Sequence, residues 1–222
     1  MKKMLKAKTI CCPKYPQDKQ SQKEKRLIKA NEILSNFVDA FHNISFGEHF
    51  LYAVDSLLSC RGKIVTTGMG KAGIAMRKFT STLCSLGFPS CYLHPGEASH
   101  GDLGLVKPKD ILFVASTSGK TREVLEIIEL SRKIGISRII GITSHSDSPI
   151  RQKADLVLDM GVFEEAGDLK LAPTTSILVM LAITDCLCLV ASEERGITKK
   201  DFGKYHHSGY LGVISRSDIS QR

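Results

Sequence analysis

The chain has 222 residues, with 31 Lys and Arg, 23 Asp and Glu and a formal net charge of +8. Hydrophobic residues make up 42% of it and charged residues 24%, which is typical of a globular protein and excludes a disordered, fibrous or disulfide-scaffold chain. Trp is absent and there are only 9 Phe and 5 Tyr, which disfavours a surface that stacks nucleic-acid bases.

The positive charge is concentrated at the N-terminus. Residues 1–30 hold the whole excess of +8, so the rest of the chain is neutral. We predict a solvated basic arm over residues 1–19, and we expect neither nucleic acid nor a membrane as a partner. Lys6 and Lys8 interrupt the first apolar stretch, so we expect no signal peptide. The seven Cys show no CxxC or paired zinc spacing, which favours reduced thiols in a cytoplasmic protein without a metal.

Helices and strands alternate along most of the chain. Apolar residues spaced by three and four predict two helices first, over about 20–46 and 48–60. Short apolar runs then predict five strands, at 63–68, 90–93, 110–116, 137–143 and 154–160. The segments between and after them have helical spacing and predict helices at about 71–86, 121–134, 173–194 and 198–203. The apolar run 176–191 falls short of a membrane span and contains Asp185. This alternation predicts an α/β protein whose parallel sheet is covered on both faces and binds ligands beyond the C-terminal strand ends.

The first loop after a strand is GMGKAG, which includes Gly68, Gly70 and Lys71. It matches the dinucleotide pattern G-x-G-x-x-G, but that reading needs an acid at the end of the next strand, which here ends in His94-Pro95. The glycines still allow a ligand to approach the backbone, and Lys71 would point at it. The alternative is that Lys71 is a solvated lysine at a helix start.

The loop STSGKTRE, residues 116–123, follows the third strand. It contains GKT, but a Walker A motif needs a Gly where Val114 stands. Hydroxyls and unpaired backbone N–H groups at a helix N-terminus suit a phosphate monoester. The alternatives are simple helix capping by Ser118 and, for Glu123, an acid favoured by the helix dipole.

Three further segments hold candidate functional residues. The loop HPGEASHGDLG, residues 94–104, contains His94, Glu97 and His100, and its density of polar side chains predicts a binding loop rather than a metal site. Glu164, Glu165 and Thr174 flank the start of the long helix, where N-capping by solvated acids is the alternative. His206 and His207 lie in a glycine-rich tail, where a surface histidine is the alternative to a proton shuttle.

Taken together and in order, GMGKAG, HPGEASHGDLG, STSGKT, LAPTTS and the tail DF-x(3)-H resemble the sugar isomerase (SIS) domain, and specifically the arabinose 5-phosphate isomerases of the Kdo pathway. The resemblance spans about residues 30–212. We therefore predict a SIS domain over 20–212 and a tail over 213–222. That family usually carries two CBS domains, and this chain is similar to the shorter members that lack them.

The resemblance implies a fold, an activity and an assembly. The fold is a three-layer α/β/α sandwich with a flavodoxin-like sheet of five parallel strands. The activity is the interconversion of ribulose 5-phosphate and arabinose 5-phosphate without a cofactor, in a homotetramer whose subunits share active sites. The product would supply Kdo for lipopolysaccharide or capsule, and CMP-Kdo could act as a feedback ligand through Lys71 and Lys120.

The resemblance also assigns residues. The catalytic set falls on Lys71, Glu123, Glu165 and His206. The residues that would contact substrate are Gly70, His94, Glu97, His100, Ser116, Thr117, Ser118, Thr121 and Thr174.

The sequence departs from the family pattern at several positions. Lys120 replaces an acid in the phosphate loop, Gly167-Asp168 stands near the position of a Cys-Pro, and the tail reads HHSG where the family has His-Pro-Gly-Gly. The altered tail leaves His206 and His207 as alternatives for one role.

Isomerisation between aldose and ketose requires a base at carbon, an acid–base group at oxygen and an anchor for the phosphate. We assign Glu165 as the carbon base and His206 as the acid–base on oxygen, although these two roles could be exchanged. Lys71 would stabilise the enediolate, and Glu123 would orient a hydroxyl or Lys71. The alternatives are a non-catalytic sugar-phosphate sensor and an isomerase of sedoheptulose 7-phosphate or a hexulose 6-phosphate.

Overall fold

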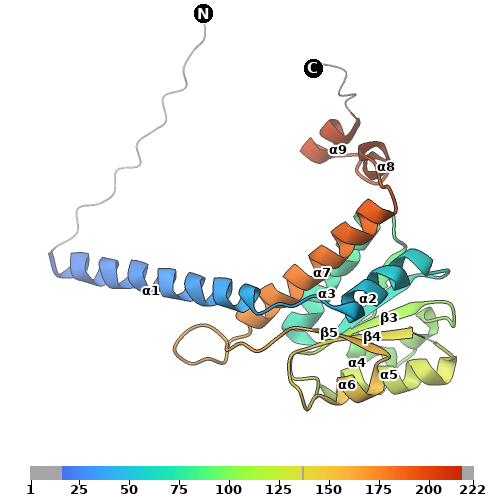
Figure 1. Ribbon diagram of the computed structural model, residues 1–222, viewed down its shortest axis with the longest axis horizontal. Helices are drawn as coiled ribbons and strands as arrows, with labels where there is room; N and C mark the ends of the chain where they lie inside the picture. The colour runs from blue at the N-terminus through green and yellow to red at the C-terminus, as the bar shows by residue number, and fades with distance from the viewer. Residues whose placement is uncertain (1–16, 137, 217–222) are drawn as a thin grey trace, which may run out of the picture.

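The computed structural model describes residues 17–136 and 138–216 (Figure 1). Most of the predicted basic arm and the last six residues of the predicted tail lie outside the described residues. The strands are β1 (Ile64–Gly68), β2 (Ser90–Tyr92), β3 (Ile111–Ala115), β4 (Arg138–Thr143) and β5 (Leu156–Asp159). The helices are α1 (Gln17–His42), α2 (Glu48–Ser59), α3 (Gly70–Ser85), α4 (Pro95–Ala98), α5 (Arg122–Ile134), α6 (Pro149–Lys153), α7 (Thr175–Glu194), α8 (Lys199–Gly203) and α9 (Gly209–Arg216), with a 3₁₀ turn η1 (Asp102–Leu105).

The five strands form one parallel sheet in the order β2-β1-β3-β4-β5. Every residue of β1 and β3 is buried, which explains why β3 is apolar throughout instead of alternating and why the Thr66 and Thr67 hydroxyls of β1 are hydrogen-bonded. The order places β1 and β3 side by side, with Val65 opposite Leu112, so the loops that follow these two strands are neighbours. The predicted five-stranded parallel sheet is confirmed.

Helices cover both faces of the sheet (Figure 1). On one face α2, α3 and α7 bury the larger apolar core, in which Phe79, Phe113 and Met180 are fully buried. On the other face α4, α5 and α6 bury a second core around Leu112, Val124 and further aliphatic side chains. The three-layer α/β/α arrangement is therefore confirmed, and a covered sheet is what the continuous apolar strands require.

The long helix α7 is part of the core. By length and composition alone its 20 residues could cross a membrane, contrary to our expectation from the run 176–191. In the structure 56% of its most apolar window is buried, and it packs against α1, α2 and α3 as a core helix does. Figure 1 shows that α7 begins near the end of α1 and carries α8 and α9 at its opposite end.

Some elements differ from the sequence predictions. The first helix ends at His42 rather than near residue 46, because residues 43–47 form the connection to α2. Pro95 and Pro149 open the short helices α4 and α6, which periodicity could not predict because they have only four and five residues. Helix α9 crosses the boundary that we placed at residue 212.

Candidate active site

Three helices begin around one cavity at the C-terminal edge of the sheet. The cavity has a volume of about 340 Å³, and its wall comes from the starts of α3 and α7, the loop before α5 and the loop after β4: Met69, Lys71, Ala72, Ala115, Ser116, Thr117, Ser118, Thr121, His145, Pro173 and Ile177. The N-cap residues Met69, Thr121 and Thr174 make no side-chain capping bond. The positive ends of the α3 and α5 helix dipoles therefore lie free near this cavity, which favours an anionic ligand, whereas a carboxylate caps α7.

A larger cavity of about 780 Å³ lies at the opposite edge of the sheet, where α2 faces the starts of β4 and β5. No residue of the predicted site lines it. Parallel α/β sheets bind ligands beyond the C-terminal strand ends, so the smaller cavity is the candidate site.

The loop from Ser116 to Thr121 is shaped by its own hydrogen bonds. The Ser116 and Thr121 hydroxyls are 2.9 Å apart, and the Gly119 N–H donates to Ser116 Oγ at 3.1 Å. Gly119 has φ +66°, and a Cβ there would lie 1.6 Å from Ser148 Oγ. Ser118 accepts from the Lys120 N–H rather than capping α5, so the hydroxyls and the first N–H groups of α5 can serve a ligand. These contacts support the predicted phosphate cradle.

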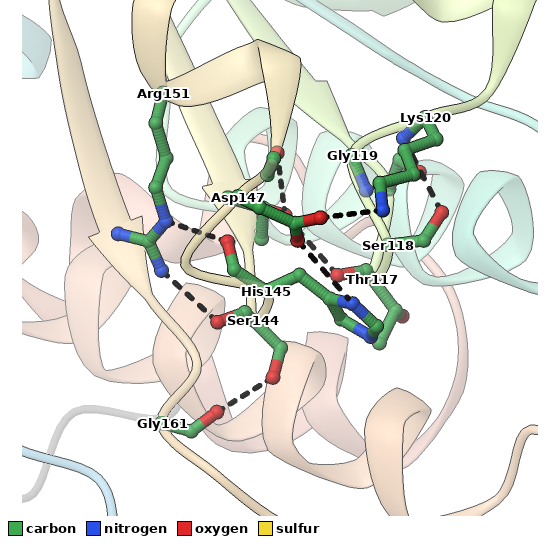
Figure 2. Close-up of polar contacts among 12 residues, drawn as sticks. Thr117, Ser118, Gly119, Lys120, Ser144, His145, Asp147, Arg151 and Gly161 are labelled. Atoms are coloured by element: carbon green, nitrogen blue, oxygen red, sulfur yellow. Dashed lines mark hydrogen bonds and ion pairs between the residues drawn. The ribbon is translucent and has the colours of Figure 1, made fainter.

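The phosphate loop is tied to the end of β4 through one carbonyl group. The Thr117 carbonyl accepts the Ser144 N–H at 3.0 Å and the Thr143 hydroxyl at 3.1 Å (Figure 2). The His145 N–H also points at it, at 3.5 Å. The pairing of β3 with β4 therefore fixes the loop that follows β4 beside the phosphate loop.

The glycines of GMGKAG have packing roles. Gly70 begins α3 with φ +59°, which favours glycine. A Cβ on Gly73 would lie 2.4 Å from the Gly68 carbonyl oxygen and 2.6 Å from Tyr92 Oη, which donates to that same oxygen. Lys71, directly after Gly70, is exposed, lines the cavity and forms no ion pair within the described residues. The loop thus places one cation on the cavity wall.

Glu165 caps the long helix next to the cavity. Its Oε2 accepts the Thr174 N–H at 2.8 Å and the Ser176 N–H at 3.3 Å. Pro173, which precedes Thr174, is part of the cavity wall. Glu165 itself does not line this cavity but, with Glu164, a separate one of about 230 Å³. The alternative of N-capping is therefore observed for Glu165, and it holds the carboxylate beside the site.

Six other predicted residues do not line the cavity within this chain. Gly70 begins α3 and Thr174 is the N-cap residue of α7, and each directly adjoins a residue that does. Glu123 is half-buried in the first turn of α5. His94 packs near Tyr92, with its Nδ1 buried and without a hydrogen-bond partner among the described residues. Glu97 and His100 are exposed, on α4 and in the turn after it.

His206 lies far from the cavity of its own chain. Its ring stacks on Phe202 at 3.8 Å, and its Nδ1 lies 3.1 Å from the Phe202 carbonyl oxygen. The preceding residue Tyr205 lies against Gly87, just beyond the end of α3, whereas Lys71 is at the start of α3. The 16 residues of α3 span about 24 Å, so His206 cannot reach the cavity that Lys71 lines.

Sequence reasoning missed His145 and assigned Lys120 a different environment. His145 lines the cavity but lies in a short polar loop with no motif, and only the pairing of β3 with β4 brings it there. Lys120 does not line the cavity, because its Nζ bonds to Asp147 Oδ2 at 2.7 Å. That hydrogen bond and the charge of Lys120 lower the pKa of Asp147.

The SIS domain family model matches residues 57–190, and the chain belongs to this family. It is 40% identical over 166 residues to the arabinose 5-phosphate isomerase KdsD of Pseudomonas aeruginosa, covering 75% of this chain and 51% of that protein. It is also 40% identical over 168 residues to the arabinose 5-phosphate isomerase KpsF of Escherichia coli, covering 74% of this chain and 53% of that protein. The chain thus spans about half the length of the curated relatives it matches.

Two solved structures share the fold over nearly their full length. A Bacteroides fragilis protein, described as a candidate phosphosugar isomerase of capsule formation, superposes with a TM-score of 0.81 and 37% identity, covering 83% of this chain and 99% of that one. An Escherichia coli protein in complex with arabinose 5-phosphate superposes with a TM-score of 0.77 and 36% identity, covering 82% of this chain and 98% of that one. Both agree with the flavodoxin-like SIS sheet that the sequence predicted.

Proposed function

We propose that the protein is an aldose–ketose isomerase that interconverts D-ribulose 5-phosphate and D-arabinose 5-phosphate. The observation that carries this proposal is the cavity on which three helix N-termini, the hydroxyl loop 116–121 and Lys71 converge. These groups suit the phosphate of a small sugar. The similarity to proteins named arabinose 5-phosphate isomerase supports the choice of sugar.

The reaction moves one proton between C1 and C2 through a cis-enediolate, while a second proton moves between O1 and O2. Glu165, held beside the cavity by the α7 N–H groups, takes the proton from carbon and returns it to the neighbouring carbon. Lys71 stabilises the negative charge of the enediolate, and Glu123 orients a hydroxyl or Lys71. The hydroxyl loop holds the phosphate and so fixes which carbons face Glu165.

His206 acts on the sugar oxygens from a neighbouring copy of the chain. Its place at the far end of α3 from Lys71 supports this, because His206 cannot reach the cavity of its own chain. The assembly is a homotetramer with shared active sites. Leu27, Leu34 and Val38 of α1 are exposed, and an isolated helix with such a surface is marginal in water, which supports burial between copies.

The protein works in the cytoplasm and supplies Kdo for lipopolysaccharide or capsule. The relatives named KdsD and KpsF support the role in supplying Kdo. CMP-Kdo acts as a feedback ligand at the same cavity, where Lys71 would meet its anionic groups, whereas Lys120 is held by Asp147.

The test is a direct assay of the purified protein with ribulose 5-phosphate, without added metal, following arabinose 5-phosphate. Ribulose 5-phosphate deuterated at C1 runs in parallel. Turnover with loss of deuterium to solvent supports an isomerase with an enediolate. Lys71→Met should abolish turnover, and Lys109→Met, an exposed lysine at the other edge of the sheet, should not. An unchanged rate at saturating CMP-Kdo would remove the feedback role.

A non-catalytic sugar-phosphate sensor is the second candidate, favoured by the altered HHSG tail around His206. A sensor would show no turnover, yet ribulose 5-phosphate would protect it from thermal unfolding. An isomerase of sedoheptulose 7-phosphate or a hexulose 6-phosphate would turn over the longer sugar and bind the pentose weakly.

A further inference from the structure

His145 is a titratable side chain on the cavity wall that the proposed mechanism does not use. It follows β4 and lines both the cavity of the phosphate loop and an adjoining depression of about 510 Å³. Its side chain is 53% exposed, so it is open to a ligand. Figure 2 shows the imidazole lying beside Thr117 and Ser118 of the phosphate loop.

The backbone around His145 is held on several sides. Arg151 donates from Nε to the His145 carbonyl at 2.7 Å and from Nη2 to the Ser144 carbonyl at 3.0 Å (Figure 2). Arg151 is itself fixed by Asp159 of β5 at 2.7 Å. The Ser148 N–H also donates to the His145 carbonyl, at 3.2 Å. The loop is therefore set before a ligand arrives, which lowers the entropic cost of binding through it.

The charges around the imidazole are distributed unevenly. Asp147 Oδ1 lies 3.9 Å from His145 Nδ1, and its Oδ2 holds Lys120 Nζ at 2.7 Å. The other charged side chains around it are the cations Lys71 and Arg151. Because Asp147 neutralises Lys120, a protonated His145 and Lys71 are the two cationic side chains that line the cavity within the described residues.

We propose that His145 is a specificity-determining residue for the phosphate end of the substrate. With Asp147 facing Nδ1, Nε2–H donates to a phosphate oxygen held by the loop 116–121, and the dianion in turn favours the imidazolium. This role rests on the proposed function. It selects phosphomonoester dianions over neutral sugars, and it supplies a cation where Lys120 cannot.

The proposal fixes a direction for the pH dependence. The protonated imidazole binds the dianion more tightly, so affinity is highest while the imidazole is charged and falls as pH rises through its titration. Imidazoles titrate near about pH 6.5, and phosphate monoesters lose their second proton near about pH 6. The informative window is therefore from about pH 6.5 to pH 8.5, where the ligand stays largely dianionic.

The test measures KM and kcat for arabinose 5-phosphate, and its dissociation constant by calorimetry, across this window. At pH 6.5 His145→Gln should raise KM and the dissociation constant about threefold to fivefold, as fits a half-exposed ion pair, with kcat within about twofold. The wild-type and variant values should converge by pH 8.5. His49→Gln is the matched control, because His49 is exposed, lies away from the cavity and could keep its bond to the Val157 carbonyl through the amide.

Two results would overturn the role of His145: an unchanged KM at pH 6.5, or a loss confined to kcat. Each requires an active wild-type protein. A wild-type protein that neither turns over nor binds arabinose 5-phosphate would instead contradict the proposed function, and this inference would fall with it. Binding without turnover would contradict only the isomerase, and the calorimetric comparison would still decide the role of His145.

Discussion

Glu165 has two tasks at the level of a single side chain. It caps α7 through the Thr174 and Ser176 N–H groups, and it is the base in the proposed mechanism. Sequence reasoning treated these as alternatives, but a carboxylate held by backbone N–H groups has a fixed position, which a base also requires. The two tasks can be separated by substitutions that remove one and keep the other.

Glu165→Gln keeps an oxygen that can accept the two N–H groups but cannot take a proton from carbon. We expect kcat to fall roughly 10²- to 10⁴-fold, with thermal stability nearly unchanged. Glu165→Ala should lose the same activity and in addition about 1 kcal/mol of stability, since the cap is removed. Steady-state kinetics and thermal unfolding of both variants check this. Full turnover by Glu165→Gln would show that another group is the base.

At the level of elements, the sequence predicted those strands and helices whose apolar pattern is long enough to be recognised. Strand β3 was predictable because burial on both faces makes it continuously apolar, and β1 because a short β-branched run ends in Gly68. The helices α4 and α6 were not, since a single turn has no periodicity. The place of His145 beside the phosphate loop depends on which strands pair, and no local pattern carries that information. The distant position of His206 follows from the length of α3 and from packing beyond its end.

The phosphate loop offers a test at this level through Gly119. Its φ of +66° and a Cβ position 1.6 Å from Ser148 Oγ mean that Gly119→Ala strains the loop by about 1–3 kcal/mol. The unfolding midpoint should fall by roughly 3–10 °C, and phosphate-ester binding should weaken. Gly104→Ala is the control, because a Cβ there meets nothing within 4 Å. Equal midpoints for the two variants in calorimetry would show that the loop tolerates a side chain.

At the level of the whole molecule, the separation of His206 from Lys71 makes shared active sites testable. Lys71→Met and His206→Gln should each be nearly inactive. Co-expressed, they form mixed tetramers in which about a quarter of the sites receive an intact Lys71 and an intact His206, so activity should return to about a quarter of wild type. Differential tags establish that the mixed tetramers form.

The matched control pairs Lys71→Met with Glu165→Gln. Glu165 is held by the N-terminus of α7, which helps to form the cavity that Lys71 of the same chain lines, so mixing should restore no activity. A tagged mixed tetramer of Lys71→Met and His206→Gln chains that stays inactive would count against donation of His206 by a neighbour.

Helix α7 has one further consequence. Its first turn forms part of one cavity, and its last turn leads to the segment that carries His206. In a homotetramer with shared active sites, the two ends of α7 would contribute to two different active sites. When sugar phosphate binds at the first turn of α7 and shifts it, the shift would then also move His206 in the active site of the neighbouring subunit, since a packed helix moves as a unit. Saturation curves would reveal such communication as cooperativity, with a Hill coefficient that departs from one.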